Sequence, residues 1–155
     1  MKKYELTEET LTVSEKTLYR IRAVRDFGFV KTGEFGGYIE KEENLSHFGN
    51  AWICGDAKVF GNARVSGNAW FSGNAEVFNT RHFFVQGPIG SRDGYVTFYR
   101  TKDDTVGVRC GCFSGSLQEF VNQVEETHGG SRYEKEYKLA AELAKVCIRL
   151  EGESR

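Results

Sequence analysis

The chain has 155 residues, of which 28% are charged, and a formal net charge of −1 at pH 7. This length predicts one compact unit or two small modules. The balanced charge does not favour nucleic acid or an anionic membrane as a partner, and no stretch is long and apolar enough to span a bilayer.

The N-terminus and the cysteines both indicate a cytoplasmic protein. The opening residues, MKKYELTEET, lack the apolar segment of a signal peptide. The four cysteines, at positions 54, 110, 112 and 147, are not spaced like a secreted disulfide framework. We therefore expect a reduced, cytoplasmic environment.

Residues 1–34 are predicted to form a β-hairpin that caps the segment after it. Residues 4–13 and 17–24 alternate like strands and flank a short turn at residues 14–16. In the second strand, Tyr19, Ile21 and Ala23 share one face. A cap of this kind would keep an apolar interior dry and shield the edges of the strands that follow.

Residues 45–78 repeat one short pattern. The hexads AWICGD, AKVFGN, ARVSGN and AWFSGN occupy residues 51–74, AEVF closes the run at 75–78, and LSHFGN at 45–50 is a degenerate copy. Each hexad has an alanine and, two positions later, a large apolar residue, so both point to the same side of a strand. The Gly-Asn or Gly-Asp pair permits a sharp corner. Such units must stack to bury their apolar sides.

This pattern resembles the hexapeptide repeat of left-handed β-helix proteins, in which three hexads form one triangular coil. The resemblance implies a mainly β fold: a short left-handed parallel β-helix over residues 35–80, flanked by the hairpin and by C-terminal helices. It also implies that residues eighteen apart stack and that the protein is a homotrimer. The alternative, a series of antiparallel hairpins, is less favoured because the inward pattern keeps its phase across the corners.

Stacking at this spacing would form two aromatic ladders. Trp52 would lie beside Trp70, and Phe60 beside Phe78. Exposed contiguous aromatic surface usually marks an interface. We therefore predict that Trp52, Trp70, Phe60 and Phe78 form an interface, covered by other chains or by the flanking segments.

The C-terminal part is predicted to contain a linker followed by a ββαα module. Residues 81–94 are rich in glycine, contain the only proline and are expected to form a loop. Residues 95–150 contain two strands and two helices. The helices begin at the capping boxes Ser116/Glu119 and Ser131/Glu134, and the second helix is apolar on more than one side. Residues 151–155 are expected to form a tail.

The loop and the adjacent hairpin contain a candidate anion site. Ser91 and Arg92 offer a hydroxyl and a guanidinium within a glycine-rich loop, and Arg100 and Arg109 come from the predicted hairpin. Backbone N–H groups, hydroxyls and guanidinium groups are the usual ligands of phosphate. The alternative is a linker with solvated charges.

Two further chemistries have candidate residues. His82 and His128 are candidates for the general base of a hexapeptide-repeat acyltransferase that uses acyl-CoA. Cys110, Cys112 and His128 have side chains that suit zinc, although C-x-C with one distant histidine is a weak pattern. Buried strand cysteines and a helix C-terminal histidine are the simpler interpretations.

Most of residues 18–150 also resembles a group of short hypothetical proteins of bacteriophages and prophages. The motifs that carry this resemblance are LYRIRAVRDF (18–27), VKTGEFGGYIEKEENLS (30–46), the hexads, and GSRDGYVTFYRTKDD, VRCGCFSGSLQEF and VEETHG within residues 90–129. The resemblance implies an accessory role in the host cytoplasm.

These observations lead to three functional hypotheses. The first is a non-catalytic phage binding protein that counters host defence, by binding an immune effector protein or by sequestering an anionic, nucleotide-like molecule. The second is the acyltransferase, and the third is a structural trimerisation or assembly module. We favour the first hypothesis, so no catalytic residue and no cofactor are expected.

Overall fold

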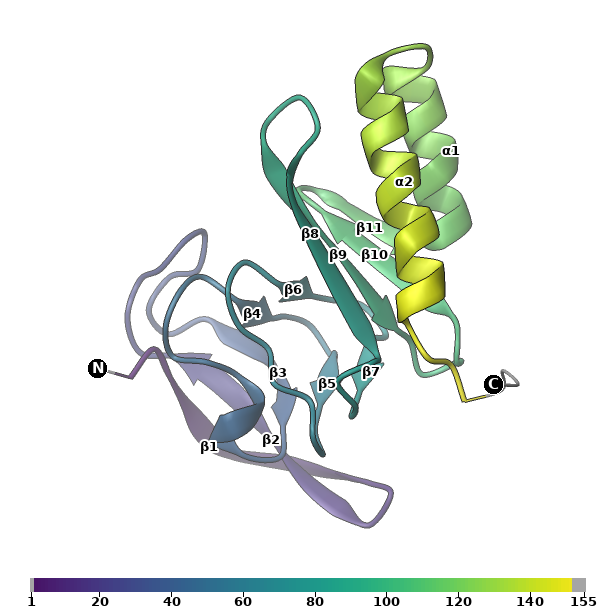
Figure 1. Ribbon diagram of the computed structural model, residues 1–155. Coiled ribbons are helices and arrows are strands. Elements are labelled where there is room, and N and C mark those ends of the chain that lie inside the picture. The colour runs from purple at the N-terminus through teal and green to yellow at the C-terminus, as the bar shows by residue number, and fades with distance from the viewer. Residues whose placement is uncertain (1, 152–155) are drawn as a thin grey trace. The chain divides into compact units, whose positions relative to one another are not determined.

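The computed structural model describes residues 2–151. They form two compact units, one up to Thr80 and one from Arg81 on (Figure 1). The elements of the first unit are β1 (Tyr4–Val13), β2 (Lys16–Ala23), β3 (Phe35–Ile39), η1 (Glu42–Asn44), β4 (Trp52–Ile53), β5 (Lys58–Val59), β6 (Trp70–Phe71) and β7 (Glu76–Val77). Those of the second unit are β8 (Phe83–Ile89), β9 (Gly94–Arg100), β10 (Val106–Cys110), β11 (Phe113–Ser116), α1 (Leu117–His128) and α2 (Arg132–Cys147).

The N-terminal hairpin is present. β1 and β2 pair antiparallel, and the turn between them is formed by Ser14 and Glu15, whose φ angles of 50° and 66° lie in the left-handed region. Ile21 and Ala23 of β2 are buried. β3 adds to the other edge of β2, so these strands form the antiparallel part of a five-stranded sheet with the order β1-β2-β3-β5-β7.

The hexads bury the residues that the repeat pattern placed inside. All five alanines and all five large apolar partners are at most 1% exposed: Ala51, Ala57, Ala63, Ala69 and Ala75 with Ile53, Val59, Val65, Phe71 and Val77. The corner glycines have positive φ, for example 60° at Gly61. The alternation along the sequence therefore identified the core of the first unit.

The predicted left-handed parallel β-helix is wrong. The protein has several sheets, and their longer strands pair antiparallel: β1 with β2, β2 with β3, and every adjacent pair in the second unit. Among named strands, parallel pairing is confined to β3 with β5, β5 with β7, and β4 with β6. The hexad strands contribute only two residues each before a corner turns the chain. The ladders of the long hairpin strands therefore dominate the architecture.

The second unit is a four-stranded antiparallel sheet with two helices. The strand order is β11-β10-β9-β8, and α1 and α2 lie side by side against one face of the sheet (Figure 1). The core between them includes Phe98, Val108, Phe120 and Ala144. Residues 81–94 were predicted to be a linker, but half of them form β8. With β11, which was also not predicted, the module has four strands rather than two. Of the predicted tail, residues 152–155 lie outside the described residues.

One of the two predicted capping boxes is present. The N–H of Glu119 donates to Oγ of Ser116 at 3.1 Å, and the N–H of Ser116 donates to Oε1 of Glu119 at 2.8 Å. The hydroxyl of Ser131 instead donates to the carbonyl of His128, and Glu134 accepts from the N–H of Gly130 at 3.0 Å. This backbone contact, together with Lys138, holds the pKa of Glu134 below its usual value.

Candidate functional site

The four residues of the predicted anion site do not converge. Ser91 and Arg92 lie exposed in the turn between β8 and β9. Arg100 ends β9, so it lies about eight residues along the chain from Arg92, roughly 25 Å away if that path is fully extended. Arg109 lies on β10 opposite Thr97, and its Nε donates to the carbonyl of Gly111 at 2.9 Å.

Contacts that Gly90 and Arg100 already make within the chain further weaken the case for an anion site. The N–H of Gly90 already donates to a carboxylate oxygen of Glu136 at 2.7 Å, so an acidic group occupies one donor that an anion would need. The side chain of Arg100 is 6% exposed, and its Nε lies 3.0 Å from Oδ1 of Asp104. Arg100 therefore belongs to a buried structural ion pair with Asp104 and is not placed to bind a ligand.

The two candidate catalytic histidines lie at opposite ends of the second sheet. His82 is buried, its carbonyl accepts from the N–H of Arg100 at 2.7 Å, and burial and the charge of Arg100 lower its pKa. The ring of His128 lies 5.5 Å from that of Tyr137, whose hydroxyl is close to Gly90 at the other end. The two histidines therefore belong to separate environments.

The candidate metal ligands form no cluster. Within residues 2–151, no three His, Cys, Asp or Glu side chains come close enough together to hold a metal ion. Cys110 ends β10 and Cys112 lies in the turn between β10 and β11, and burial raises the pKa of the Cys110 thiol. A raised pKa disfavours the thiolate form that binds zinc.

The predicted aromatic interface is largely covered within the chain. Trp52 is fully buried, and its ring lies 5.2 Å from that of Phe27. Phe60 is 3% exposed and stacks on Phe78 at 5.0 Å, in a cluster that the hairpin strands β1 and β2 help to cover. Trp70 is partly buried, and its Nε1 donates to Sγ of Cys54 at 3.2 Å. The flanking segments, one of the two alternatives considered, therefore cover Trp52 and Phe60, which provide no free interface.

The most exposed aromatic side chains of the first unit lie outside the predicted aromatic interface. Phe29 is 86% exposed and Phe48 is 82% exposed. They project from two loops, residues 24–34 and 46–51, and we call these two side chains with their loops the aromatic loop surface. The only sequence signal was an unexplained phenylalanine in each loop, because the pattern Phe27-Gly28-Phe29 does not tell which ring points inward.

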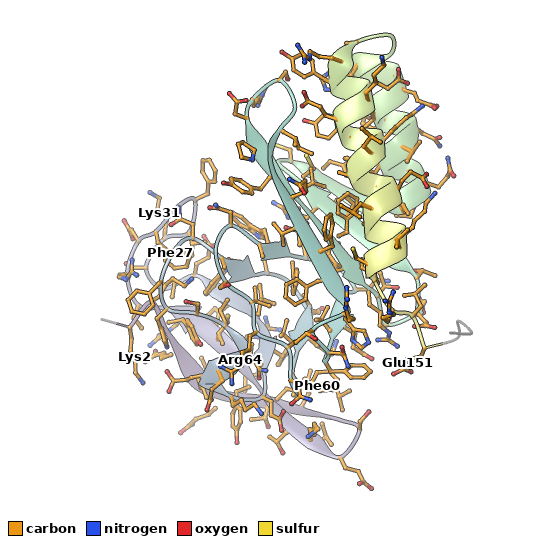
Figure 2. The ribbon with its side chains drawn as sticks, in the orientation of Figure 1. Lys2, Phe27, Lys31, Phe60, Arg64 and Glu151 are labelled. Atoms are coloured by element: carbon orange, nitrogen blue, oxygen red, sulfur yellow. The ribbon has the colours of Figure 1, made fainter. Side chains whose placement is uncertain are left out.

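Backbone and side-chain contacts hold the two loops side by side. Nη2 of Arg25 donates to the carbonyl of His47 at 3.1 Å, and a Cβ added at Gly28 would lie 3.4 Å from Asn50. Phe27 and Val30 exchange two backbone hydrogen bonds, of 3.0 and 2.8 Å, so Phe29 sits in a closed turn. Figure 2 labels Phe27 and Lys31 on this loop. The exposed rings are therefore presented by a fixed backbone.

A buried lysine lies beneath the aromatic loop surface. Lys3 is fully buried, its Nζ donates to the carbonyl of Ala51 at 2.7 Å, and it lies 4.8 Å from the centre of the Phe27 ring. Burial, followed by the charge of Arg25, lowers the pKa of Lys3 to about 8. The base of the surface thus contains an ammonium group that is desolvated but held by a carbonyl and an aromatic ring.

Lys3 should make the free energy of unfolding change with pH in the alkaline range. Its pKa is depressed in the folded state, so between pH 8 and about 10.4 the unfolded chain binds the proton more tightly and stability rises with pH. We expect the free energy of unfolding, taken relative to Lys3→Met, to rise by on the order of 2–3 kcal/mol across this range. Chemical denaturation of both proteins at several pH values measures this difference. A difference that stays constant with pH would contradict the assignment.

A scan against protein-family models and a search of curated proteins found no match to this chain. Among residues 2–151, none of the helices combines the length and apolar character needed to cross a membrane. The functional interpretation of the aromatic loop surface therefore rests on its geometry: two exposed phenylalanines on adjoining loops that are fixed by hydrogen bonds.

Proposed function

We propose that this chain is a non-catalytic binding protein that engages a partner protein through the aromatic loop surface. The observation that carries the proposal is the exposure of Phe29 and Phe48, 86% and 82%, on loops that are themselves fixed by hydrogen bonds. Large aromatic residues contribute strongly to protein interfaces when a pocket of the partner desolvates them. Fixed loops lose little conformational freedom on binding, which favours affinity.

A protein partner is better supported than a small anion. The rings offer apolar area, and the loop that carries Phe29 has exposed charges of both signs, Lys31 with Asp26 and Glu34. The predicted anion residues in the second unit are dispersed, with Arg100 paired to Asp104 and Gly90 bonded to Glu136. The partner surface that fits best is an apolar pocket.

The acyltransferase and assembly alternatives have less support. A general base must reach the proton that it removes. His82 is buried, and His128 packs against Tyr133 and Tyr137. An assembly role was tied to the four aromatic ladder residues, of which Trp52 and Phe60 are buried within the chain.

The sequence resemblance to phage proteins suggests the biological setting of the proposed binding. An accessory phage protein would act in the cytoplasm of the host, and its partner would be a protein of host defence. The assignment of the partner to host defence rests on analogy with the phage proteins that the sequence resembles, and it names a class of partner to test. The residues proposed to bind that partner come from the geometry of the loops.

The test compares capture of a host partner by the native chain and by Phe29→Ser/Phe48→Ser. Loss of one hot-spot side chain typically costs 2 kcal/mol or more, so we expect the double variant to bind the identified partner at least about 30-fold more weakly. The affinity of each protein for the purified partner is measured by calorimetry. The melting temperature should not fall, because both side chains are exposed.

Tyr95→Ser is the matched control, because Tyr95 is an exposed aromatic residue, 40% accessible, in the second unit. It should leave the affinity for the partner unchanged. Equal affinity of the native chain and the Phe29→Ser/Phe48→Ser variant would refute the proposal. A control variant that loses binding as strongly as the double variant would show that general stickiness, not the loops, explains the capture.

A further inference from the structure

Helix α2 exposes an apolar stripe on the side that faces away from the core. Leu139, Leu143 and Val146 are 70%, 47% and 67% exposed. Their spacings of four and three residues place them on one face of the helix. Ala140, Ala141 and Ala144, on the other side, are buried in the core of the second unit. The helix is thus apolar on two sides, and only one of them is covered.

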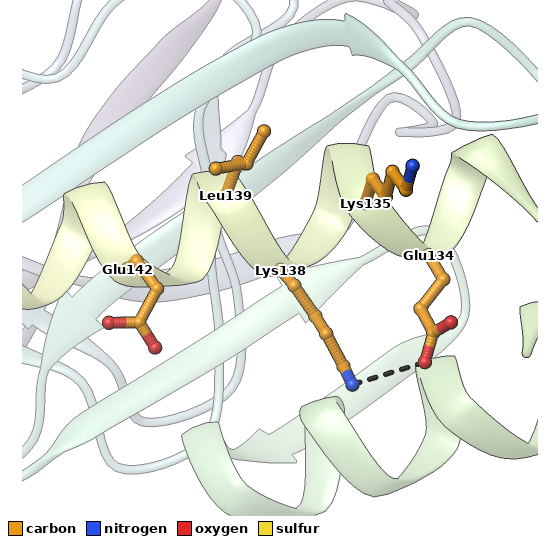
Figure 3. Close-up of a pocket in the computed structure, with 5 residues that line it drawn as sticks. All are labelled: Glu134, Lys135, Lys138, Leu139 and Glu142. Atoms are coloured by element: carbon orange, nitrogen blue, oxygen red, sulfur yellow. Dashed lines mark ion pairs between the residues drawn. The ribbon is translucent and has the colours of Figure 1, made fainter. Parts of the chain in front are cut away.

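A hollow lies along the same part of α2. Its lining is formed by Glu134, Lys135, Lys138, Leu139 and Glu142. Residues 135, 138, 139 and 142 have the spacing i, i+3, i+4, i+7, which surrounds the hole that receives a side chain from a neighbouring helix. Figure 3 shows Lys138 and Glu134 reaching towards the adjacent helix while Leu139 projects from the opposite side. The adjacent helix is α1, where Lys138 pairs with Glu125 at 2.6 Å.

Two of the charged residues that line the hollow, Lys135 and Glu142, can pair between two copies, whereas Lys138 pairs with Glu134 and Glu125 of its own chain. Lys135 precedes Leu139 by four residues, and Glu142 follows it by three. The two charged residues are seven positions apart, so they lie on the same side of the helix about 10.5 Å from each other. Read in the opposite direction, the order Lys, Leu, Glu becomes Glu, Leu, Lys. An antiparallel copy of the same helix therefore presents each charge to its opposite.

We propose that this face of α2 binds the same face of a second copy of the chain, with the two helices antiparallel. Leu139 of each copy seats in the hollow of the other, and Lys135 of each lies opposite Glu142 of the other. Leu143 packs along the aliphatic stem of a charged residue from the first turns of the opposing helix. This inference uses residues of the second unit only and does not depend on the aromatic loop surface.

Other arrangements of two such helices are less favourable. A parallel pair would bring equivalent residues to the same height, with Lys135 level with Lys135. Like charges in contact are unfavourable. A two-fold contact also closes at two copies. The proposed surface therefore gives a dimer, in contrast to the trimer that the hexads had implied.

Sedimentation of the full-length chain tests this pairing. We expect the native protein to sediment at twice the chain mass. Leu139→Lys places a charge at the centre of the contact and should weaken the pairing at least tenfold. At a concentration low enough to dissociate both proteins, the variant and the native chain should have the same melting temperature, because the side chain of Leu139 is 70% exposed. A native chain that is monomeric at roughly 100 µM, a range where weak specific pairs form, or that is trimeric, would overturn the proposal.

A charge-reversal pair tests the register. Lys135→Glu alone and Glu142→Lys alone each place like charges opposite one another at both ends of the contact, so each variant should pair at least tenfold more weakly than the native chain. An equimolar mixture of the two variants restores both opposite-charge contacts and should pair as the native chain does. Glu142 also forms an exposed pair with Lys145 at 3.1 Å, whose loss has little effect on folding. If the mixture pairs no better than either variant alone, the antiparallel register is wrong.

Discussion

Replacing Gly37 by alanine is expected to destabilise the first unit by about 3 kcal/mol or more. A Cβ on Gly37 would lie 2.4 Å from the carbonyl oxygen of Ala57 and 2.7 Å from Cγ2 of Ile53. The N–H of the next residue, Tyr38, donates to that same carbonyl at 2.9 Å, so the oxygen has little freedom to move away. The variant must therefore break a β-ladder contact or displace the strand.

The fluorescence of the two tryptophans reports this loss, because both lie in the first unit. Urea unfolding followed by tryptophan emission gives the free energy of unfolding of that unit. The native chain, unfolded under the same conditions, is the reference. A Gly37→Ala variant as stable as the native chain would show that the neighbouring strand tolerates the methyl group.

The hydrophobic alternation predicted which residues of the hexads are buried but not the sheets they join. Alternation is a local property of the chain, and it identified the inward side from Ala51 to Val77 correctly. Strand pairing depends on partners far away in sequence, such as β3 and the N-terminal hairpin. The repeat therefore suggested a uniform architecture, whereas the long antiparallel strands determine the observed one.

β8 was missed because its glycine and proline are typical of a linker. An inner strand is hydrogen-bonded on both sides, so every N–H is needed, and a proline, which has none, breaks the pairing. An edge strand has one open side and tolerates a proline. β8 is the edge strand of the order β11-β10-β9-β8, so Pro88 fits there. The charged residues were misjudged for a related reason. Gly90 donates to Glu136, which lies 46 residues away, so no local signal indicates that contact. Arg100 pairs with Asp104 across the turn that follows β9, which the sequence analysis did not foresee.

Exposure was equally hard to infer for single aromatic residues. Phe48 precedes the Gly49-Asn50 corner and Trp52 follows it, yet Trp52 is fully buried and Phe48 is 82% exposed. The difference arises because Tyr4 and Phe27, both far from Trp52 in sequence, pack against its ring. Candidate binding residues of this kind can be recognised only once the covering segments are placed.

Asn44→Ala should have an effect as large as Gly37→Ala, because Asn44 is fully buried and hydrogen-bonded at both ends of its amide. Its Oδ1 accepts from the N–H groups of Glu40 and Lys41, at 3.2 and 3.0 Å. Its Nδ2 donates to the carbonyls of Gly61 and Ala63, at 3.2 and 2.9 Å. Alanine would leave these backbone groups without that partner, and we expect a loss of about 3–5 kcal/mol.

Asn44→Asp separates the donating role of the amide from its accepting role. The new carboxyl keeps the acceptor for the two N–H groups, but when ionised it faces the carbonyls of Gly61 and Ala63 with no proton to donate. Burial and this repulsion raise its pKa in the folded state above the unfolded value of about 3.9. Stability of the Asn44→Asp variant, relative to the native chain, should therefore be highest below pH 4 and fall as the pH rises. Urea unfolding of the two proteins at acid and neutral pH measures the difference. A relative stability that does not change with pH would mean that the two carbonyls do not need the amide of Asn44.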